Sequence, residues 1–434
     1  MASRLRRRIQ AAWKRRHGPI WRSRLAAGLG AVALGLVAIA FARLADEAQA
    51  LFGELTGRWP YAPLILTPAG LVAIVAFTRR FAPASRGSGI PQVIAAAEHI
   101  GLADRLMSPF TGLAKLVLTL LALLCGASVG REGPTVQVGA AIMMMVNRLL
   151  GVPITSAVLI AGGAAGVAAA FNAPLAGVAF AIEELAAAYE QRLALLVMAA
   201  VMLAGFVSLG IAGDYVYFGS MRRSLPLATV FLASPVAGVI GGLLGGLFAR
   251  GLLALSRPKR GPLAALTSRP LLFAAACGLA IGVIGILSHG LTWGTGYAPA
   301  RALVEGHDQP WTFAPAKFAA TFLTSASGAP GGIFAPSLAT GAGVGDLIAL
   351  WFGHDYRAPI VVLGMIAYFV GVVRAPLTGV IIVSEMTDDR AMIVPLFLAA
   401  IVADFVSKAV CNERLYYGLS RAFADEGGER TAEV

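Results

Sequence analysis

Apolar stretches recur along almost the whole chain, and only short polar segments separate them. A helix perpendicular to a bilayer needs about 20 apolar residues, yet several stretches are shorter and many contain Gly or Pro. Broken backbone is tolerated at membrane depth only where protein or a water-filled cavity surrounds it. The pattern therefore predicts an all-α integral membrane protein of short, partly broken helices, as in transporters and channels. The main apolar stretches are residues 25–42, 63–77, 113–129, 135–150, 155–171, 193–213, 228–255, 271–288, 357–373 and 391–407.

The charge distribution agrees with a membrane location. Only 13% of the residues are charged and 58% are hydrophobic, whereas soluble domains carry about 25% charged residues. Basic residues concentrate in the N-terminal segment 1–24 and in short loops at 79–86 and 257–260, which predicts a cytoplasmic N-terminus. We expect these clusters to contact lipid headgroups and not nucleic acid. The three cysteines and five histidines are scattered, so no disulfide framework or metal site is predicted.

The chain contains an internal repeat. "GASVGREGPTVQVGA" (126–140) aligns with "GAPGGIFAPSLATGA" (328–342), and "APLAGVAFAIEE" (173–184) aligns with "APLTGVIIVSEM" (375–386). Both alignments have the same offset, because 328 − 126 and 375 − 173 both equal 202. Two related membrane halves with interrupted helices at matching positions predict a substrate site at the interface between the halves.

The repeat defines a provisional division of the chain. The two membrane repeats are placed at residues 25–220 and 221–420, between a basic N-terminal segment, 1–24, and a C-terminal tail, 421–434. The short helices leave open, from the residues alone, whether the two halves run parallel or inverted.

Three short motifs share one plan. "GSGIP" (87–91), "GREGP" (130–134) and "GIFAP" (332–336) each begin with Gly, place Pro four residues later, and precede an apolar run. Pro is suited to a first helical turn, where its missing N–H is not needed. A single motif of this kind is better explained as a kink, but three of them, two related by the repeat, predict converging helix N-termini. Such ends present free N–H groups and the positive end of the helix dipole, so a small inorganic anion is the expected ligand.

In this order, the three motifs closely resemble the signature of the CLC family of chloride channels and chloride/proton antiporters. Residues 169–185, "AAFNAPLAGVAFAIEEL", and 374–388, "RAPLTGVIIVSEMTD", are similar to that family too, and the match runs from about residue 25 to about residue 420. The resemblance implies a homodimer in which each subunit has its own anion pathway. It also implies two inverted-topology repeats of short, tilted helices, a bacterial plasma (inner) membrane location, and cytoplasmic termini at both ends. The family binds chloride and no cofactor, and it is not a family of enzymes. We expect no C-terminal CBS modules, because the chain ends shortly after the last match.

The resemblance assigns the two proton-handling residues. It makes Glu132 of "GREGP" the gate and external proton acceptor, and Glu184 the internal proton-transfer residue. The first role makes chemical sense on its own, because a carboxylate is itself an anion that competes for an anion site until it is protonated. The backbone N–H groups from Arg131 to Gly133 are placed near the outer anion, and the Arg131 side chain is expected to be structural. Glu183 is expected to be solvated at a helix end.

The resemblance also assigns the chloride-binding residues. Ser88 corresponds to the residue whose hydroxyl contacts the central anion, and in the family serine here accompanies chloride preference and proline nitrate preference. A hydroxyl donates a hydrogen bond without adding a net charge, so the chloride ion stays weakly held, as conduction requires. Ile333 and Phe334 contribute backbone N–H groups. Tyr416 is assigned the hydroxyl that closes the site from inside, although the neighbouring Tyr417 leaves that register open.

Two further positions stay open. Gln92 follows "GSGIP" where relatives often carry Glu. Lys115 lies in an apolar run, and the alternatives are that it tunes the electric field of the pore or that it pairs with an acid.

Three functions are compared. The leading hypothesis is a chloride/proton antiporter that relays protons through Glu132 and Glu184, and the alternative on the same fold is a passive chloride channel gated by voltage or pH. The acid at Glu184 favours the antiporter. An intramembrane hydrolase with Ser88 as nucleophile and Glu132 as base is the third hypothesis, but the serine lacks a recognisable His or Lys partner.

Overall fold

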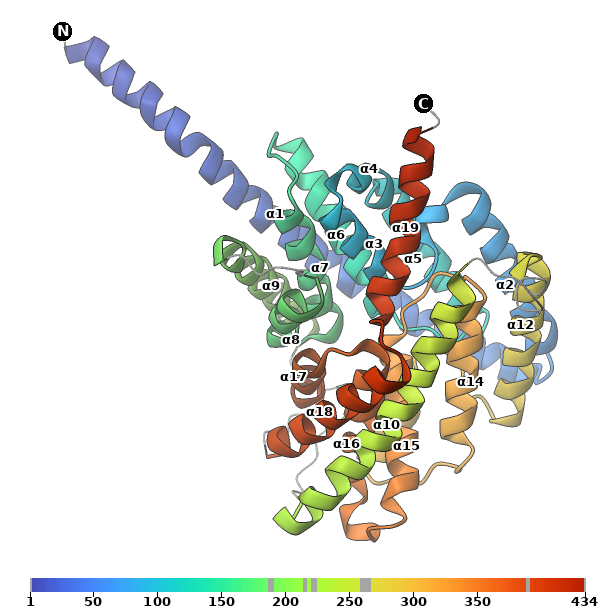
Figure 1. Ribbon diagram of the computed structural model, residues 1–434. Helices are drawn as coiled ribbons and strands as arrows, with labels where there is room; N and C mark the ends of the chain where they lie inside the picture. The colour runs from blue at the N-terminus through green and yellow to red at the C-terminus, as the bar shows by residue number, and fades with distance from the viewer. Residues whose placement is uncertain are drawn as a thin grey trace.

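The computed structural model describes residues 2–185, 191–213, 217–219, 225–257, 267–387 and 391–432. Helices dominate these residues, and the β-bridge found among them joins two glycines, Gly130 and Gly332. Figure 1 shows helices crossing at varied angles in one body, from which the N-terminal part of the first helix projects. The predicted all-α architecture is confirmed.

The helices are α1 (Ala2–Arg58), α2 (Pro63–Phe81), η1 (Pro83–Ser85), α3 (Ile90–Glu98), η2 (Ile100–Leu102), α4 (Ala103–Leu106), α5 (Pro109–Leu124), α6 (Glu132–Leu149), α7 (Ser156–Phe171), α8 (Pro174–Phe180), η3 (Ala181–Leu185), α9 (Gln191–Ala212), α10 (Leu227–Ser256), α12 (Pro270–Leu287), α13 (Tyr297–Val304), α14 (Phe313–Ala326), α15 (Phe334–Ala349), η4 (His354–Tyr356), α16 (Arg357–Val373), α17 (Pro376–Thr387), α18 (Ile393–Val410) and α19 (Leu415–Ala432).

The described helices fit a multi-pass membrane protein. Five of them are long and apolar enough to cross a bilayer, and a sixth span results if the bent pair Ile100–Leu106 and Pro109–Leu124 is counted as one. Four other apolar helices, among them α7 and α16, are shorter than a full span. Helices α7 and α16 lie inside the protein, because nearly every residue of each is buried. Short helices are tolerated there, since protein and not lipid surrounds their ends.

The first helix is longer than the hydropathy pattern indicated. The sequence separated a basic segment, 1–24, from an apolar stretch at 25–42, whereas α1 is continuous over 57 residues. At about 1.5 Å per residue it is about 85 Å long, against about 30 Å for the bilayer core. Residues 43–55, "RLADEAQALFGEL", are rich in helix-forming Ala, Leu, Glu and Arg. Hydropathy therefore marks where lipid contact stops, but not where the helix ends.

The helices occur in pairs with nearly constant spacing along the chain. The starts of α6 and α15 differ by 334 − 132 = 202 residues, and the same spacing separates α8 from α17 and α9 from α18. The starts of α2 and α12 differ by 270 − 63 = 207 residues, as do those of α3 and α13. The segment from the start of α12 to the start of α15 is therefore five residues shorter than the equivalent segment from α2 to α6. The repeat extends well beyond the two aligned motifs.

Reciprocal contacts join equivalent residues of the two halves. Gly130 N donates to Gly332 O (2.7 Å), and Gly332 N donates to Gly130 O (2.8 Å). Glu183 accepts hydrogen bonds from Leu377 N and Thr378 N at the start of α17, and its repeat equivalent Glu385 accepts them at the start of α8. Each of these contacts from the first half to the second is matched by an equivalent contact from the second half to the first. This exchange indicates that the halves are related by a twofold rotation.

The crossings of α6 with α7 and of α15 with α16 are equivalent in the two halves, and both are very close. A Cβ atom added to Gly162 on α7 would lie 2.6 Å from the carbonyl oxygen of Gly139 on α6, and one added to Gly364 on α16 would lie 2.5 Å from that of Gly341 on α15. These glycines are again related by the 202-residue offset. Small residues at such crossings let helix backbones touch, which is how membrane helices pack without a hydrophobic driving force. The packing fixes α6 and α15, and with them the positions of their first residues, Glu132 and Phe334.

The expectation that Glu183 is solvated is wrong. Its carboxylate accepts from Leu377 N (3.1 Å), Thr378 N (2.7 Å) and Thr378 Oγ1 (2.8 Å), and so it caps α17. Glu385 does the same for α8 through Leu175 N (3.3 Å) and Ala176 N (2.9 Å). The capped helix belongs to the other half in both cases, so the role depends on tertiary packing.

We predict that Glu183→Ala and Glu385→Ala each destabilise the purified protein by about 1 to 2 kcal/mol, because each leaves a helix N-terminus uncapped. Thermal unfolding in detergent measures the effect as a lower Tm for both variants. Glu47 is exposed on α1, and Glu47→Ala serves as the control that leaves the Tm in place. Unchanged Tm values in both cap variants would contradict the proposed capping role.

Candidate functional site

Backbone hydrogen bonds hold the three glycine motifs together. Gly331 N donates to Gly87 O (3.1 Å), which joins the loop before α15 to the loop before α3. The paired glycines Gly130 and Gly332 join the loops before α6 and α15. The predicted convergence of three helix N-termini, which begin at Ile90, Glu132 and Phe334, is therefore confirmed.

The side chain of Glu132 lies against the other half of the molecule. It is fully buried, and its Oε2 accepts a long hydrogen bond from Ala335 N (3.4 Å) in the first turn of α15. Its Oε1 accepts from the hydroxyl of Tyr297 (2.6 Å). The carboxylate thus occupies the place at a helix N-terminus where an anion is expected to bind. A Cβ atom on Gly130 would lie 2.3 Å from Glu132 Oε2, so a larger residue there would displace the carboxylate from this position.

Two buried hydroxyl groups lie close to these helix ends without a hydrogen-bond partner in the described part of the chain. One is Ser88 Oγ, which faces the start of α6, since a Cβ atom on Gly133 would lie 2.4 Å from it. The other is Tyr416 Oη, on a ring 6.0 Å from that of Phe334. Burying a hydroxyl without a partner costs free energy. A ligand that accepts hydrogen bonds would remove that cost for both groups.

The structure distinguishes Tyr416 from Tyr417. Tyr416 is fully buried and its hydroxyl is unpartnered among the described residues, whereas Tyr417 donates its hydroxyl to the carbonyl of Glu184 (3.2 Å). Of the two tyrosines, Tyr416 is the one whose hydroxyl lacks a partner among the described residues and whose ring lies beside Phe334.

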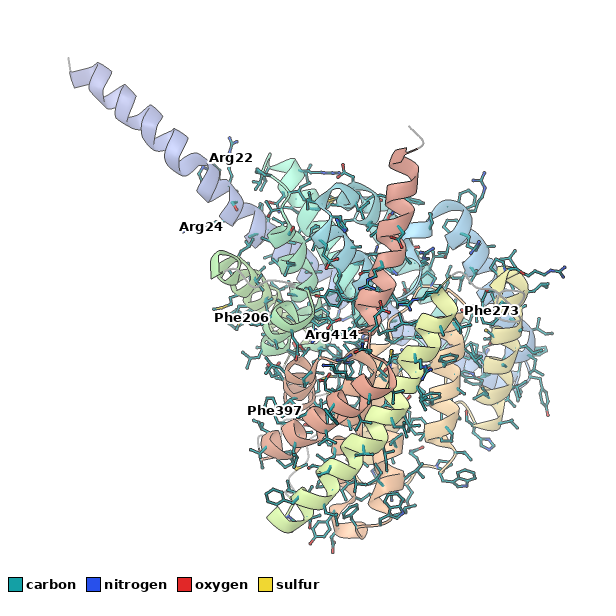
Figure 2. All side chains as sticks on the ribbon, in the orientation of Figure 1. Arg22, Arg24, Phe206, Phe273, Phe397 and Arg414 are labelled. Carbon is teal, nitrogen blue, oxygen red and sulfur yellow. The ribbon has the colours of Figure 1, made fainter. Side chains whose placement is uncertain are left out.

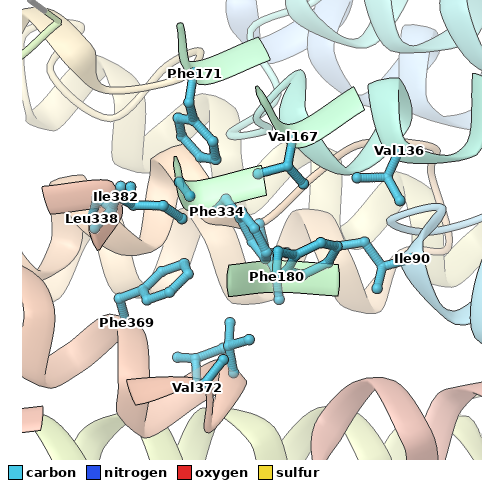
Figure 3. Packing of buried hydrophobic residues seen from close by; sticks show 14 of the residues in the cluster. Ile90, Val136, Val167, Phe171, Phe180, Phe334, Leu338, Phe369, Val372 and Ile382 are labelled. Carbon is cyan, nitrogen blue, oxygen red and sulfur yellow. The ribbon is translucent and has the colours of Figure 1, made fainter. Parts of the chain in front are cut away.

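Aromatic packing fixes Phe334, the first residue of α15. Figure 3 shows its ring surrounded by Phe171, Phe180 and Phe369, with ring centroids 5.9, 5.8 and 5.0 Å away respectively. Edge-to-face and stacked pairs of this kind stabilise a buried cluster beyond simple burial. The backbone N–H groups at Ile333 and Phe334 are thereby held in one place.

Arg131 anchors the loop before α6 to α1. Its Nη1 donates to Ala42 O (2.8 Å) and to Asp46 Oδ1 (2.9 Å), and its Nη2 donates to Tyr217 Oη (3.0 Å). Its guanidinium also lies over the Tyr217 and Tyr297 rings. These contacts agree with the structural role expected for the side chain.

Glu184 lies in η3, a π-helical turn at the end of α8. It is fully buried, and neither carboxylate oxygen has a hydrogen-bond partner in the described part of the chain. π-Helical turns occur often at functional sites, and an unpartnered buried carboxylate is costly as an anion. Both features agree with a group that exchanges a proton and does not serve as a permanent ion-pair partner.

Among the described residues, Lys115 pairs with backbone carbonyl groups and with no acid. Its Nζ donates to Gly87 O (2.7 Å) and Arg86 O (3.4 Å), just before the "GSGIP" helix. Lys317, which is 202 residues further along, donates to Gly294 O (2.8 Å) and Thr292 O (3.0 Å) before α13. The two buried lysines brace equivalent loops in the two halves.

Sequence analysis missed a fourth opening of the same kind. "GTGYAP" (294–299) corresponds to "GSGIP" at an offset of 294 − 87 = 207. Gly294 and Gly296 have φ angles of 66° and 83°, and Gly87 and Gly89 have φ angles of 63° and 109°. An internal comparison that allowed the offset to change from 202 to 207 would have found this motif. It would also have found Tyr297, its helix-starting residue.

A model of the family described as "Voltage gated chloride channel" matches residues 69–408. The chain belongs to this family, the CLC proteins. It is 32% identical over 437 aligned positions to the H(+)/Cl(-) exchange transporter ClcA of Cronobacter sakazakii (strain ATCC BAA-894), covering 94% of this chain and 92% of that protein.

Two solved structures have the same fold. The X-ray structure of a slow cyanobacterial Cl-/H+ antiporter matches with a TM-score of 0.80 at 24% identity, covering 93% of this chain and 98% of that one. A CLC-type fluoride/proton antiporter matches with a TM-score of 0.74 at 24% identity, covering 91% and 98%. The chain therefore has the CLC fold, with its two inverted repeats.

The geometry does not provide a hydrolase pair. Glu132 is engaged by Tyr297 and Ala335, and Ser88 Oγ forms no hydrogen bond in the described part of the chain. A serine nucleophile needs a base within hydrogen-bond reach, and CLC proteins are transporters, not enzymes.

We predict that Lys115→Met and Lys317→Met both lower the Tm of the purified protein. Lys317→Met removes the side-chain donor to the buried carbonyl groups of Thr292 and Gly294. Lys115→Met removes one of two donors from each of Arg86 O and Gly87 O, which keep Gln92 Nε2 and Gly331 N, so we expect its Tm to fall less. Each unmet group costs about 1 to 3 kcal/mol. Lys408 is exposed on α18, and Lys408→Met is the matched control. Equal Tm values for all three variants would contradict the bracing role of the buried pair.

Proposed function

We propose that this protein is a chloride/proton antiporter of the bacterial plasma membrane. The observation that carries the proposal is the carboxylate of Glu132 at the N-terminus of α15, 3.4 Å from Ala335 N. A carboxylate at such a place competes directly with a mobile anion, because both are attracted by the same N–H groups and helix dipole. When it is protonated, it loses that attraction and leaves the place to chloride.

The central chloride is assigned to the donors that surround this helix end. Ser88 Oγ and Tyr416 Oη provide the side-chain donors, and Ile333 and Phe334 provide backbone N–H groups. Support comes from the two hydroxyl groups, which are buried and unpartnered among the described residues. The N–H groups from Arg131 to Gly133 are assigned to the outer position. Only neutral donors face the ion in this arrangement, so it is held weakly enough to leave.

Glu184 is assigned the proton on the internal side. The two glutamates then form separate ends of a proton path, with Glu132 shared between proton and chloride. Exchange follows from that sharing, since chloride passes the gate only in exchange for a proton delivered to it. The name of the Cronobacter relative, an H(+)/Cl(-) exchange transporter, supports this assignment over a passive channel.

We further propose that residues 25–220 and 221–420 are the two membrane repeats and that both termini are cytoplasmic. Segments 1–24 and 421–434 then form the cytoplasmic ends. In support, Figure 1 places both chain ends toward the same side of the molecule. The basic N-terminal segment follows the positive-inside rule.

The protein is proposed to act as a homodimer within the lipid bilayer, through the edge formed by α8, α9, α17 and α18. These helices lie side by side at one edge of the molecule in Figure 1. Large apolar side chains are exposed there, including Leu175, Phe206 and Phe405. Figure 2 shows Phe206 and Phe397 along the same edge. A second copy of the chain is the partner expected from the family, and the twofold axis of such a dimer makes the contact self-complementary.

The test uses purified protein in liposomes loaded with chloride, without a pH gradient, and an external pH electrode. We predict that chloride leaving the liposomes drives protons inward, so that the external pH rises. In Glu184→Gln the chloride flux continues while proton movement falls to the level of protein-free liposomes, because the internal proton donor is lost.

Glu47→Gln, on the exposed face of α1, is the control that retains coupling. Chloride flux without proton movement in the unmodified protein would make it a passive channel. Proton movement that survives in Glu184→Gln would remove the internal role from that residue.

A further inference from the structure

We propose that Tyr297 is a positioning residue that holds the Glu132 carboxylate at the N-terminus of α15 and thereby sets the pH range in which chloride exchange runs. The inference rests on the proposed role of Glu132 as the gate. It concerns a residue of α13, a helix that the three glycine motifs do not include.

The contact itself is short and direct. Tyr297 Oη donates to Glu132 Oε1 at 2.6 Å, while the other carboxylate oxygen accepts from Ala335 N at 3.4 Å. The tyrosine bond is the shorter of the two. A hydrogen bond from a hydroxyl to a carboxylate is stronger than one between neutral groups, so Tyr297 contributes substantially to holding the charged gate in place.

The tyrosine ring is fixed from several sides. It stacks on the Tyr217 ring, with centroids 4.9 Å apart, and packs on Phe218 at 5.3 Å. The guanidinium of Arg131 lies 5.6 Å from its centroid. A phenol held in this way has little rotational entropy left to lose when it bonds the carboxylate.

The loop before Tyr297 is fixed as well. Lys317 Nζ donates to Thr292 O and Gly294 O, and Gln49 Oε1 accepts from both Thr295 N (2.8 Å) and Thr295 Oγ1 (3.1 Å). The buried lysine therefore acts on the gate indirectly, by fixing the residue that follows its loop.

Tyr297 also forms part of the wall of a cavity of about 880 Å³. Its lining includes Asp46 and Gln49 on α1, Trp293 and Thr295 before α13, and Tyr297 itself. Tyr297 is only partly buried, whereas Glu132 is fully buried. The tyrosine thus borders both a wide cavity and the gate.

The hydrogen bond favours one protonation form of the gate. The carboxylate accepts from Tyr297 strongly, whereas a protonated carboxyl is neutral and accepts more weakly. Loss of the hydroxyl therefore destabilises the charged, docked form, and the gate protonates at a higher pH. The titratable groups that face Glu132 are Arg131 on its own loop, Tyr297 on α13 and Tyr416 on α19, with Asp46 and Tyr217 acting through Arg131.

The experiment measures chloride efflux from liposomes as a function of pH for the parent and for Tyr297→Phe. The phenylalanine keeps the ring and its stacking but lacks the hydroxyl. We expect the pH of half-maximal efflux to rise by about one unit, which corresponds to a charge-assisted hydrogen bond worth about tenfold in equilibrium. Tyr368 is buried and its hydroxyl has no partner among the described residues, so Tyr368→Phe is the matched control with an unshifted profile.

A second comparison is made in Glu132→Gln, which cannot ionise. There, adding Tyr297→Phe should leave the efflux profile unchanged, because the bond has lost its charged acceptor. A parent-like profile for Tyr297→Phe, or a shift that persists in the Glu132→Gln background, would overturn the inference. If instead Glu132→Gln keeps the pH dependence of the parent, the proposed gate itself is wrong, which separates the two failures.

Discussion

The backbone pairing of Gly130 with Gly332 is the contact on which the site depends. It joins equivalent residues of the two halves through hydrogen bonds of 2.7 and 2.8 Å, so it lies on the twofold axis that relates them. Two helices, α6 and α15, begin two residues later and therefore start next to each other. Neither half could build this arrangement alone, because each contributes one of the adjoining helix N-termini.

The same symmetry organises the supporting contacts. Glu183 and Glu385 cap helices of opposite halves, and Lys115 and Lys317 brace equivalent loops. The two acids proposed to carry protons have no acidic equivalent in the second half. Glu132 and Glu184 are acids, but the residues 202 positions later are Phe334 and Met386. The proposed gate and the proposed internal acid thus belong to the first half only, and the second half supplies the N–H group of Ala335 that Glu132 accepts from.

Local signals made much of the site predictable. Gly followed by Pro marked the three helix starts, and the placement of Glu132 at one of them needed no tertiary information. The role of Glu183 could not be predicted in the same way, since its partner helix α17 lies almost two hundred residues away in the chain. Tyr297 was missed because its motif lies 207 residues after "GSGIP", whereas the two aligned motifs share an offset of 202 residues. The length of α1 was missed because polar helix formers continue it beyond the apolar stretch.

The central claim is that the Glu132 carboxylate and a mobile anion compete for one place at the α15 N-terminus. Crystals of the protein and of Glu132→Gln, grown in bromide, test it most directly through the anomalous scattering of that ion. The account predicts a bromide peak beside Ala335 N in Glu132→Gln that the unmodified protein lacks, because its carboxylate fills that place. Bromide beside Ala335 N in both proteins, or in neither, would contradict the account.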